Sequence, residues 1–152
     1  MLNILEYFDN NNSCFLLGKG KCEAIAKEGA LKIKEITYIH AEGYSTSSLK
    51  HGPFALLDKD FPVIMFGVND NNLTKVLNAY EEVKTRGAKI IFITDKDIEF
   101  DDNKSIIKIA NNSTFNSLLS IIPIQLLAYN LSIKRGINPD MPKNLAKVVT
   151  VE

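Results

Sequence analysis

The chain has 152 residues, 45% of them hydrophobic, which suffices for one domain that buries about two-thirds of its unfolded surface. Its 18 basic and 18 acidic residues give a formal net charge of zero, which argues against nucleic acid or an anionic membrane as a partner. The N-terminus has no signal-peptide pattern and apolar runs such as PVIMFGV are too short to span a bilayer, so we expect a cytoplasmic protein.

The first half of the chain predicts a short helix, a strand and a long helix. Residues 2–9 fit a short amphipathic helix, and SCFLLG (13–18) is typical of a strand buried on both faces. After the turn GKG, a helix is expected from about Cys22 to Thr37. The segment YIHAEGYS is interpreted as short and extended, and STSSLKHGPFALLD as a short capped helix that the Gly-Pro pair stops.

The second half alternates strands and helices more regularly. Strands are expected at 62–68, 89–95 and 105–110, and a helix from about Leu73 to Thr85. A strongly apolar helix is expected over 117–136, kinked or divided by Pro123. This alternation with continuous apolar strands predicts an α/β fold: a three-layer αβα sandwich around a mainly parallel sheet, formed as one domain over 1–152.

The long helix carries an unusual charged stripe within KEGALKIKE. Glu28, Lys32 and Glu35 are four and three residues apart, so they fall on one stripe of a helix, with apolar residues on both borders. One interpretation is two salt bridges on a solvated face, which contribute little to stability. The other is a sheltered carboxylate beside an amine, which suits a base that moves protons on carbon. The residues alone leave both open.

Three loops offer further candidate positions. GKGKC after the first strand and NDNNL after the second lie where ligands bind in parallel sheets, although tight turns explain them equally well. The hydroxyl run STSS could hold a phosphate or simply cap a helix. His51, beside a Gly-Pro break, is either a plain polar loop residue or an acid or base at a cleft.

The remaining candidates do not suggest a metal site. His40, Glu42 and His51 lack a recognisable metal spacing, and Cys14 and Cys22 form no CxxC pair and are expected to be reduced. We therefore predict neither a metal nor a cofactor. By itself, a lysine in the tail such as Lys147 would be expected to lie in solvent.

Two long segments resemble a known family. KEGALKIKEITYIHAEGYSTSSLKHGPFALLDKDFPVIMF and the ending PKNLAKVVTVE resemble the sugar isomerase (SIS) domain family. More narrowly, they resemble the second, C-terminal SIS subdomain of the glucosamine-6-phosphate synthases, the isomerizing glutamine–fructose-6-phosphate aminotransferases. The motifs EGALKxKE, YIHAE, LKHGP and NLAKxVTVE follow in the order and spacing of that family, over essentially the whole chain.

The resemblance implies a role for each matching position. Glu35 would be the base that carries a proton between C1 and C2 of the open-chain sugar, and Lys32 would contact the sugar. His51 would help to open the ring of fructose 6-phosphate from a neighbouring subunit, which implies a homodimer. Lys147, in the tail 137–152, would form a Schiff base with the ketose, and Glu28 would be a supporting acid.

The departures from the family limit what this chain is expected to do alone. It begins Met1-Leu2-Asn3, without the cysteine nucleophile of a glutaminase domain, and the first SIS subdomain, whose Ser/Thr-rich loop holds most of the phosphate, has no counterpart here. Ser48 stands where the family commonly has glutamate. Hydroxyl contacts to the sugar phosphate would instead come from Ser45, Thr46 and Ser47.

These observations predict the sugar-phosphate isomerase module of a glucosamine-6-phosphate synthase, an enzyme that converts fructose 6-phosphate to glucosamine 6-phosphate but is incomplete as this chain. The alternatives are a stand-alone SIS module that senses sugar phosphates, or a subunit of a related amino-sugar phosphate isomerase or deglycase.

Overall fold

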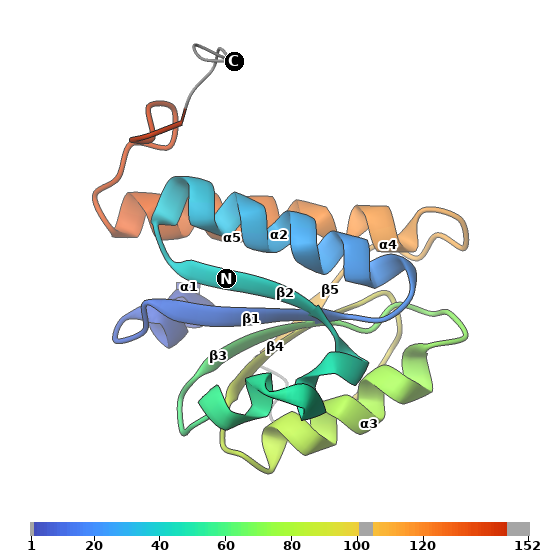
Figure 1. Ribbon diagram of the computed structural model, residues 1–152. Coiled ribbons are helices and arrows are strands. Elements are labelled where there is room, and N and C mark those ends of the chain that lie inside the picture. The colour runs from blue at the N-terminus through green and yellow to red at the C-terminus, as the bar shows by residue number, and fades with distance from the viewer. Residues whose placement is uncertain (1, 101–104, 146–152) are drawn as a thin grey trace, which may run out of the picture.

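The computed structural model describes residues 2–100 and 105–145, and within them one parallel sheet organises the chain (Figure 1). The strand order is β2-β1-β3-β4-β5, and every neighbouring pair is parallel. The strands are β1 (Ser13–Gly18), β2 (His40–Ser45), β3 (Pro62–Phe66), β4 (Lys89–Thr94) and β5 (Ile106–Lys108).

Helices cover both faces of this sheet, which confirms the predicted three-layer αβα architecture (Figure 1). One face carries α1 (Leu2–Leu5), η1 (Glu6–Phe8), α2 (Lys21–Thr37), α4 (Asn116–Leu119) and α5 (Ile121–Lys134). The other face carries the 3-10 turns η2 (Thr46–His51) and η3 (Pro53–Leu56) together with α3 (Leu73–Lys84).

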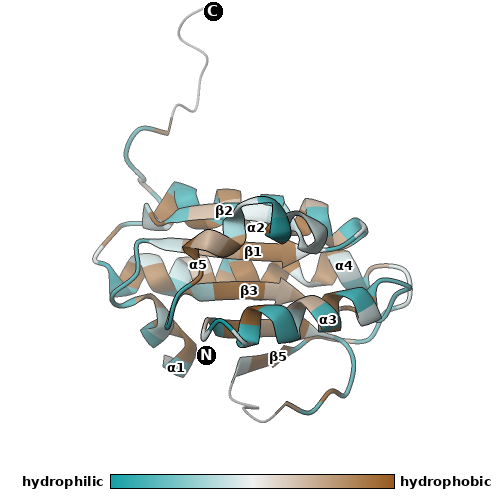
Figure 2. Ribbon diagram, turned by 60° about the horizontal axis from the view of Figure 1, so that its bottom comes forward, coloured by the Kyte–Doolittle hydropathy of each residue, from teal (hydrophilic) through white to brown (hydrophobic). Residues whose placement is uncertain are grey.

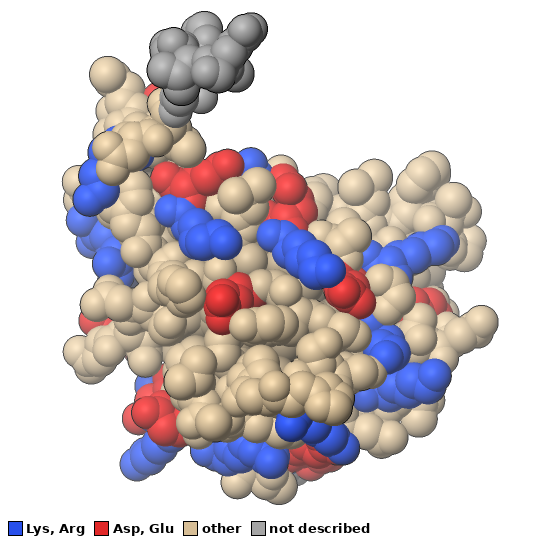
Figure 3. Space-filling model, viewed as in Figure 1, with Lys and Arg blue, Asp and Glu red and all other residues tan. Residues whose placement is uncertain are grey.

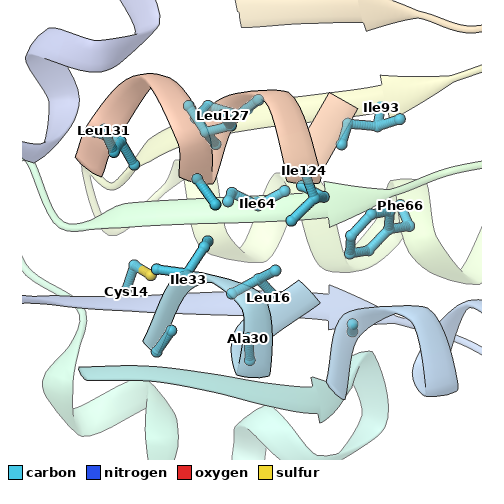
Figure 4. Close-up of a cluster of buried hydrophobic side chains, with 14 of the residues drawn as sticks. Cys14, Leu16, Ala30, Ile33, Ile64, Phe66, Ile93, Ile124, Leu127 and Leu131 are labelled. Carbon is cyan, nitrogen blue, oxygen red and sulfur yellow. The ribbon is translucent and has the colours of Figure 1, made fainter. Parts of the chain in front are cut away.

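Side-chain alternation along β1 divides the apolar interior into two cores. Cys14 and Leu16 point toward α2 and α5, where Leu16, Ile33 and Ile124 are fully buried (Figure 4). Phe15 and Leu17 point the opposite way, toward α3. Because successive side chains of a strand face opposite sides of a sheet, one apolar run supplies both cores, as the prediction of strands buried on both faces requires.

Three details differ from the sequence-based prediction. The extended segment YIHAEGYS is a full edge strand, since its backbone pairs with β1 from Ser13 to Gly18. The segment after it forms 3-10 turns without a side-chain cap at Ser45. The apolar helix divides at Ser120, so Pro123 lies in the first turn of α5, where its missing N–H removes no helical hydrogen bond.

The expectation that no apolar segment is long enough to span a bilayer was wrong for Asn116–Lys134. This stretch is long and apolar enough to cross a membrane, with a mean hydropathy of 1.3. Half of it is nevertheless buried against the rest of the fold, and the core helix of a globular domain passes the same test. Much of the α5 ribbon is brown in Figure 2.

The turn from β1 into α2 requires glycine at position 18. A Cβ built on Gly18 would lie 2.0 Å from the carbonyl oxygen of Cys22, and a backbone atom cannot rotate away. We expect Gly18→Ala to lower the free energy of unfolding by about 3 kcal/mol or more, measured by urea titration.

Gly29→Ala is the matched control within α2. Its Cβ would lie 2.8 Å from Cδ2 of Leu16 and 3.1 Å from Cγ2 of Ile124, both side-chain ends that can move. Alanine also gains about 1 kcal/mol of helix propensity over glycine, so we expect a small net change. Equal losses for the two variants would show that the backbone contact at position 18 is unimportant.

Candidate active site

The three predicted charged residues of α2 form one connected group. Nζ of Lys32 donates to Oε2 of Glu35 at 2.8 Å and lies 3.6 Å from Oε1 of Glu28. The Glu35 side chain is 25% exposed and Lys32 is 32% exposed, whereas Glu28 is 49% exposed. The stripe is therefore neither buried nor fully solvated. Lys32 and Glu35 are sheltered while still open to a ligand. We call Glu28, Lys32 and Glu35 the charged triad.

The charged triad lies on the flank of α2 that faces α5. Gly29 approaches Ile124 of α5, and Ile25 and Ile36 pack against the same core. Steps of four and three residues place Lys32 on the stripe that joins these positions. The triad thus sits at the edge of the packed α2–α5 layer, with an apolar base beneath it.

The electrostatics of the triad favour the charged form of its amine. The hydrogen bond to Glu35 raises the pKa of Lys32 above its usual value, and the charges of Glu35 and Glu28 act in the same direction. Lys32 therefore stays an ammonium at neutral pH and presents a fixed positive charge between two carboxylates. Such a charge can attract an anionic or carbonyl oxygen.

A second ion pair on α2 provides a comparison. Nζ of Lys27 lies 2.8 Å from Oε1 of Glu23, on the opposite flank. The two side chains are 62% and 35% exposed, and no second carboxylate joins them among the ion pairs of the described residues. This pair fits the expectation for a solvated helix face. Its two side chains are more exposed than Lys32 and Glu35, and it lacks the second carboxylate that the triad has. Figure 3 shows acidic and basic side chains interspersed over this side of the molecule.

His51 is not brought to the triad within one chain. It is the last residue of η2 and is exposed, on the sheet face that carries α3. Glu35 belongs to α2, on the other face. The sheet separates the two side chains, so a site that uses both must take His51 from another chain.

The predicted hydroxyl residues lie at a different end of the sheet. Ser45 ends β2 and Thr46 is buried, whereas Ser47 is exposed and accepts a hydrogen bond from Nζ of Lys19. A cavity of about 230 Å³ lies beside them, between η2 and α3, and its lining residues are Thr46, Ser47, Lys50, Lys75, Asn78, Ala79 and Glu82. α2 runs back from this end of the strands, so Glu35, in its last turn, lies toward the opposite end.

The loops at the carboxyl ends of β1 and β3 pack against each other through their own residues. A Cβ on Gly20 would lie 2.6 Å from Nδ2 of Asn72, whose backbone N–H donates to Asp70. Asp95, almost fully buried, accepts from the backbone N–H of Asn69 at 2.7 Å. These loops are joined to each other and explain GKGKC and NDNNL as structural turns.

Lys147 lies outside the described residues, but the tail leading to it does not. Residues 137–145 leave the end of α5 beside the end of α2 (Figure 1). The phenol oxygen of Tyr38 accepts a hydrogen bond from the backbone N–H of Lys143 at 2.8 Å. Sequence reasoning missed Tyr38, although a bulky residue directly after the helix was the available signal.

The other candidates for metal or thiol chemistry are explained by packing. Over residues 2–100 and 105–145, no group of three His, Cys, Asp or Glu residues is placed to hold a metal ion. Cys14 and Cys22 are free and buried, and burial raises the pKa of each thiol to about 12. His40 pairs with Glu42 at 3.6 Å on the exposed edge of β2.

Comparisons with known proteins all point to one family. A sequence model of the SIS domain family matches residues 7–135. The chain is 55% identical, over 98% of its length, to a probable isomerizing glutamine–fructose-6-phosphate aminotransferase of Acanthamoeba polyphaga mimivirus, and covers 25% of that protein. It is 46% identical, over 97% of its length, to a probable enzyme of the same description from Schizosaccharomyces pombe, of which it covers 21%.

A solved structure supports the same relationship. The C-terminal domain of glucosamine-fructose-6-phosphate aminotransferase from Francisella tularensis matches with a TM-score of 0.84 and 40% identity. The match covers 91% of this chain and 40% of that domain. The chain thus spans about a quarter of the length of the curated relatives it matches and less than half of the solved domain.

Proposed function

Since the chain belongs to the SIS domain family, we propose that it is the sugar-phosphate isomerase module of a glutamine–fructose-6-phosphate aminotransferase. Its substrate would be fructose 6-phosphate and its product glucosamine 6-phosphate. The 55% identity to one such relative supports this assignment. We further propose that residues 1–152 act as one cytoplasmic SIS domain whose tail, 137–152, contributes to the site.

The proposed reaction uses the chain's own side chains in sequence. His51 of a second subunit helps to open the sugar ring, and the amine of Lys147 attacks the C2 carbonyl, releasing water to form a Schiff base. Ammonia then displaces the lysine, leaving an imine at C2. The carboxylate of Glu35 removes a proton from C1 and returns it to C2, while the proton of the C1 hydroxyl passes to the nitrogen, which produces the amino aldose.

The observation that carries this proposal is the ammonium of Lys32 held between the carboxylates of Glu28 and Glu35 in partial shelter. A base that transfers a proton between two adjacent carbons must not be fully hydrated, and the Glu35 side chain is only 25% exposed. The ammonium of Lys32 lies 2.8 Å from Oε2 of Glu35. It also supplies a donor for the oxygen atoms of the sugar.

An exposed apolar surface on α4 and α5, in the helical layer that also contains α2, supports the need for further domains. Six large apolar side chains on α4, α5 and the residue before them are each 48–58% exposed: Phe115, Leu118, Ile122, Leu126, Tyr129 and Ile133. We call them the apolar face. The sequence from Phe115 to Ile133 contains no charged residue, and an apolar groove of about 300 Å³ adjoins it. A helix that is apolar on all sides is usually covered.

We propose that the first SIS subdomain covers this apolar face. Less than half of the Francisella domain matches this chain, so a comparable mass of protein remains to be packed against it. A domain seated on the apolar face would also reach the triad on the neighbouring flank of α2 and exclude water from it. The site would then be completed by the contact that buries the apolar side chains.

Substitutions on the apolar face should weaken that contact. In a titration of this chain with the unmatched portion of the Francisella domain, we expect Leu126→Glu to reduce affinity at least tenfold, because a buried Leu contributes about 1.5–3 kcal/mol. Lys27→Glu, on the opposite flank of α2, is the control and should bind normally. Equal affinities for both variants would place the contact elsewhere.

The function itself is tested by binding and turnover of fructose 6-phosphate. For the chain alone, we expect weak binding by isothermal titration and little turnover with ammonia, since the family's main phosphate loop is absent. Adding the unmatched portion of the Francisella domain should increase both. Tight binding without turnover would instead indicate a sugar-phosphate sensor, and turnover of a different amino-sugar phosphate would indicate a related isomerase or deglycase.

A further inference from the structure

A polar cavity lies on the sheet face that carries α3, away from the charged triad. It has a volume of about 230 Å³ and lies between η2 and one flank of α3, which are side by side (Figure 1). Thr46, in its lining, comes directly after β2, so the cavity adjoins the carboxyl ends of the strands. Ligands bind at this edge of open parallel sheets. We call it the η2–α3 cavity.

Thr46 presents a hydroxyl to this cavity that the fold itself does not use. The residue is only 6% exposed, yet its Oγ1 has no hydrogen-bond partner within residues 2–100 and 105–145. In that part of the chain, no fully enclosed side-chain nitrogen or oxygen lacks a partner. The hydroxyl of Thr46 is therefore reached from the cavity that the residue lines. Because an unpaired hydroxyl in so buried a residue costs free energy, a ligand in the cavity would be stabilised by pairing with it.

The other polar groups around the η2–α3 cavity are mainly hydrogen-bond donors. Nζ of Lys75 and Nδ2 of Asn78 lie on exposed side chains that have no hydrogen bond or ion pair with any residue the structure describes. The hydroxyl oxygen of Ser47 accepts a hydrogen bond from Nζ of Lys19, so its own proton remains available to donate. Donors from both walls of the cavity can therefore reach one ligand.

The charges of the lining favour an anion. Nζ of Lys50 lies 2.8 Å from Oε1 of Glu82, so one positive charge is balanced within the lining. Lys75 has no such partner among the described residues, and Lys19 adds a positive charge beside Ser47. A phosphate group suits these donors better than a carboxylate does, because it has three strong acceptor oxygens instead of two. The volume is below the roughly 300–1,000 Å³ of clefts that hold larger ligands, so it suits a small phosphate compound.

We propose that the η2–α3 cavity is a second ligand site, which binds the phosphate group of a small phosphate monoester. The hydroxyls of Thr46 and Ser47, the ammonium of Lys75 and the amide of Asn78 donate to the phosphate oxygens. The cavity and the charged triad lie on opposite faces of the sheet and toward opposite ends of its strands. One small molecule therefore cannot occupy both places in one chain, and this site goes beyond the proposed function.

The test is a titration followed by the backbone amide shifts in NMR spectra of the chain. The two ligands are inorganic phosphate and glycerol 3-phosphate, a monoester without a carbonyl group, at constant ionic strength. We expect both to shift the amides of residues 46–51 and 75–82 saturably. Thr46→Val and Lys75→Gln should each raise the Kd about tenfold or more, because each removes a hydrogen bond to a charged group.

Three controls separate the loss of a ligand contact from a loss of structure. Thr46→Val keeps the shape of the side chain and removes a hydroxyl without a protein partner, so its thermal midpoint should not fall. Glu82→Gln should lower the Kd, because it removes the carboxylate of the lining and frees Lys50 for the anion. Lys34→Gln removes an exposed charge of α2, across the sheet from the cavity, and should leave the Kd unchanged.

The outcomes that would overturn the site are specific. Unchanged Kd values in both Thr46→Val and Lys75→Gln would do so, as would amide shifts confined to the charged triad and lost in Lys32→Gln. Binding of inorganic phosphate without binding of glycerol 3-phosphate would overturn the assignment to a monoester. None of these results depends on turnover of fructose 6-phosphate, so failure of this site leaves the proposed function intact.

Discussion

Glu35→Gln is expected to slow the exchange of the C1 proton of fructose 6-phosphate with solvent deuterium by about 10²–10⁴-fold, the usual contribution of a general base. The amide keeps the size and shape of the side chain but cannot accept the proton. The measurement is the loss of the C1 proton signal by NMR, for this chain assembled with the unmatched portion of the Francisella domain.

Glu23→Gln is the matched control for this experiment. Both glutamates lie on α2 and bond to a lysine at 2.8 Å, but Glu23 belongs to the opposite, solvated flank. Each substitution removes one partly exposed ion pair, which contributes less than about 1 kcal/mol, so the thermal midpoints should shift similarly. Only Glu35→Gln should lose exchange. Retained exchange in that variant would remove Glu35 from the proton transfer and with it the proposed mechanism.

Mixing two inactive variants is expected to restore activity if His51 acts across a subunit boundary. The sheet lies between His51 and Glu35 in one chain, so a site that used both residues would combine them from different chains. His51→Ala and Glu35→Gln should each be inactive in conversion of ring-closed fructose 6-phosphate. After dissociation and equal mixing, half of the dimers are mixed and carry one intact site of two.

The expected recovery is therefore about a quarter of the activity of the unsubstituted protein, given random pairing in a two-fold dimer. The measurement is glucosamine 6-phosphate formed with ammonia after mixing, compared with each variant alone. A mixture of His51→Ala with His40→Ala is the control. Dimers of His40→Ala should be active at both sites, so a site in this mixture is impaired only where residue 51 comes from a His51→Ala chain. Zero recovery with the first pair would show that His51 does not complete the site of a second chain.

Much of the architecture could be predicted from local patterns. Short apolar runs ending at glycine or turn residues marked β1, β3 and β4, because strands buried on both faces lack polar positions. The helical spacing of Glu28, Lys32 and Glu35 predicted their contact, since residues three and four apart meet on any α-helix. Pro123 predicted a kink or division of the apolar helix, whereas the place of that division at Ser120 and the 3-10 form of η2 depended on tertiary packing.

The sequence by itself determined the α/β class, the composition of the charged triad and the resemblance to the SIS domain family, because each depends on residues close together along the chain. The tertiary structure decided which face of the sheet carries each element. It thereby separated His51 from Glu35, packed α5 next to α2, and joined Tyr38 to Lys143. Contacts between distant segments depend on how helices cross a sheet, and side-chain periodicity within one segment contains no information about that.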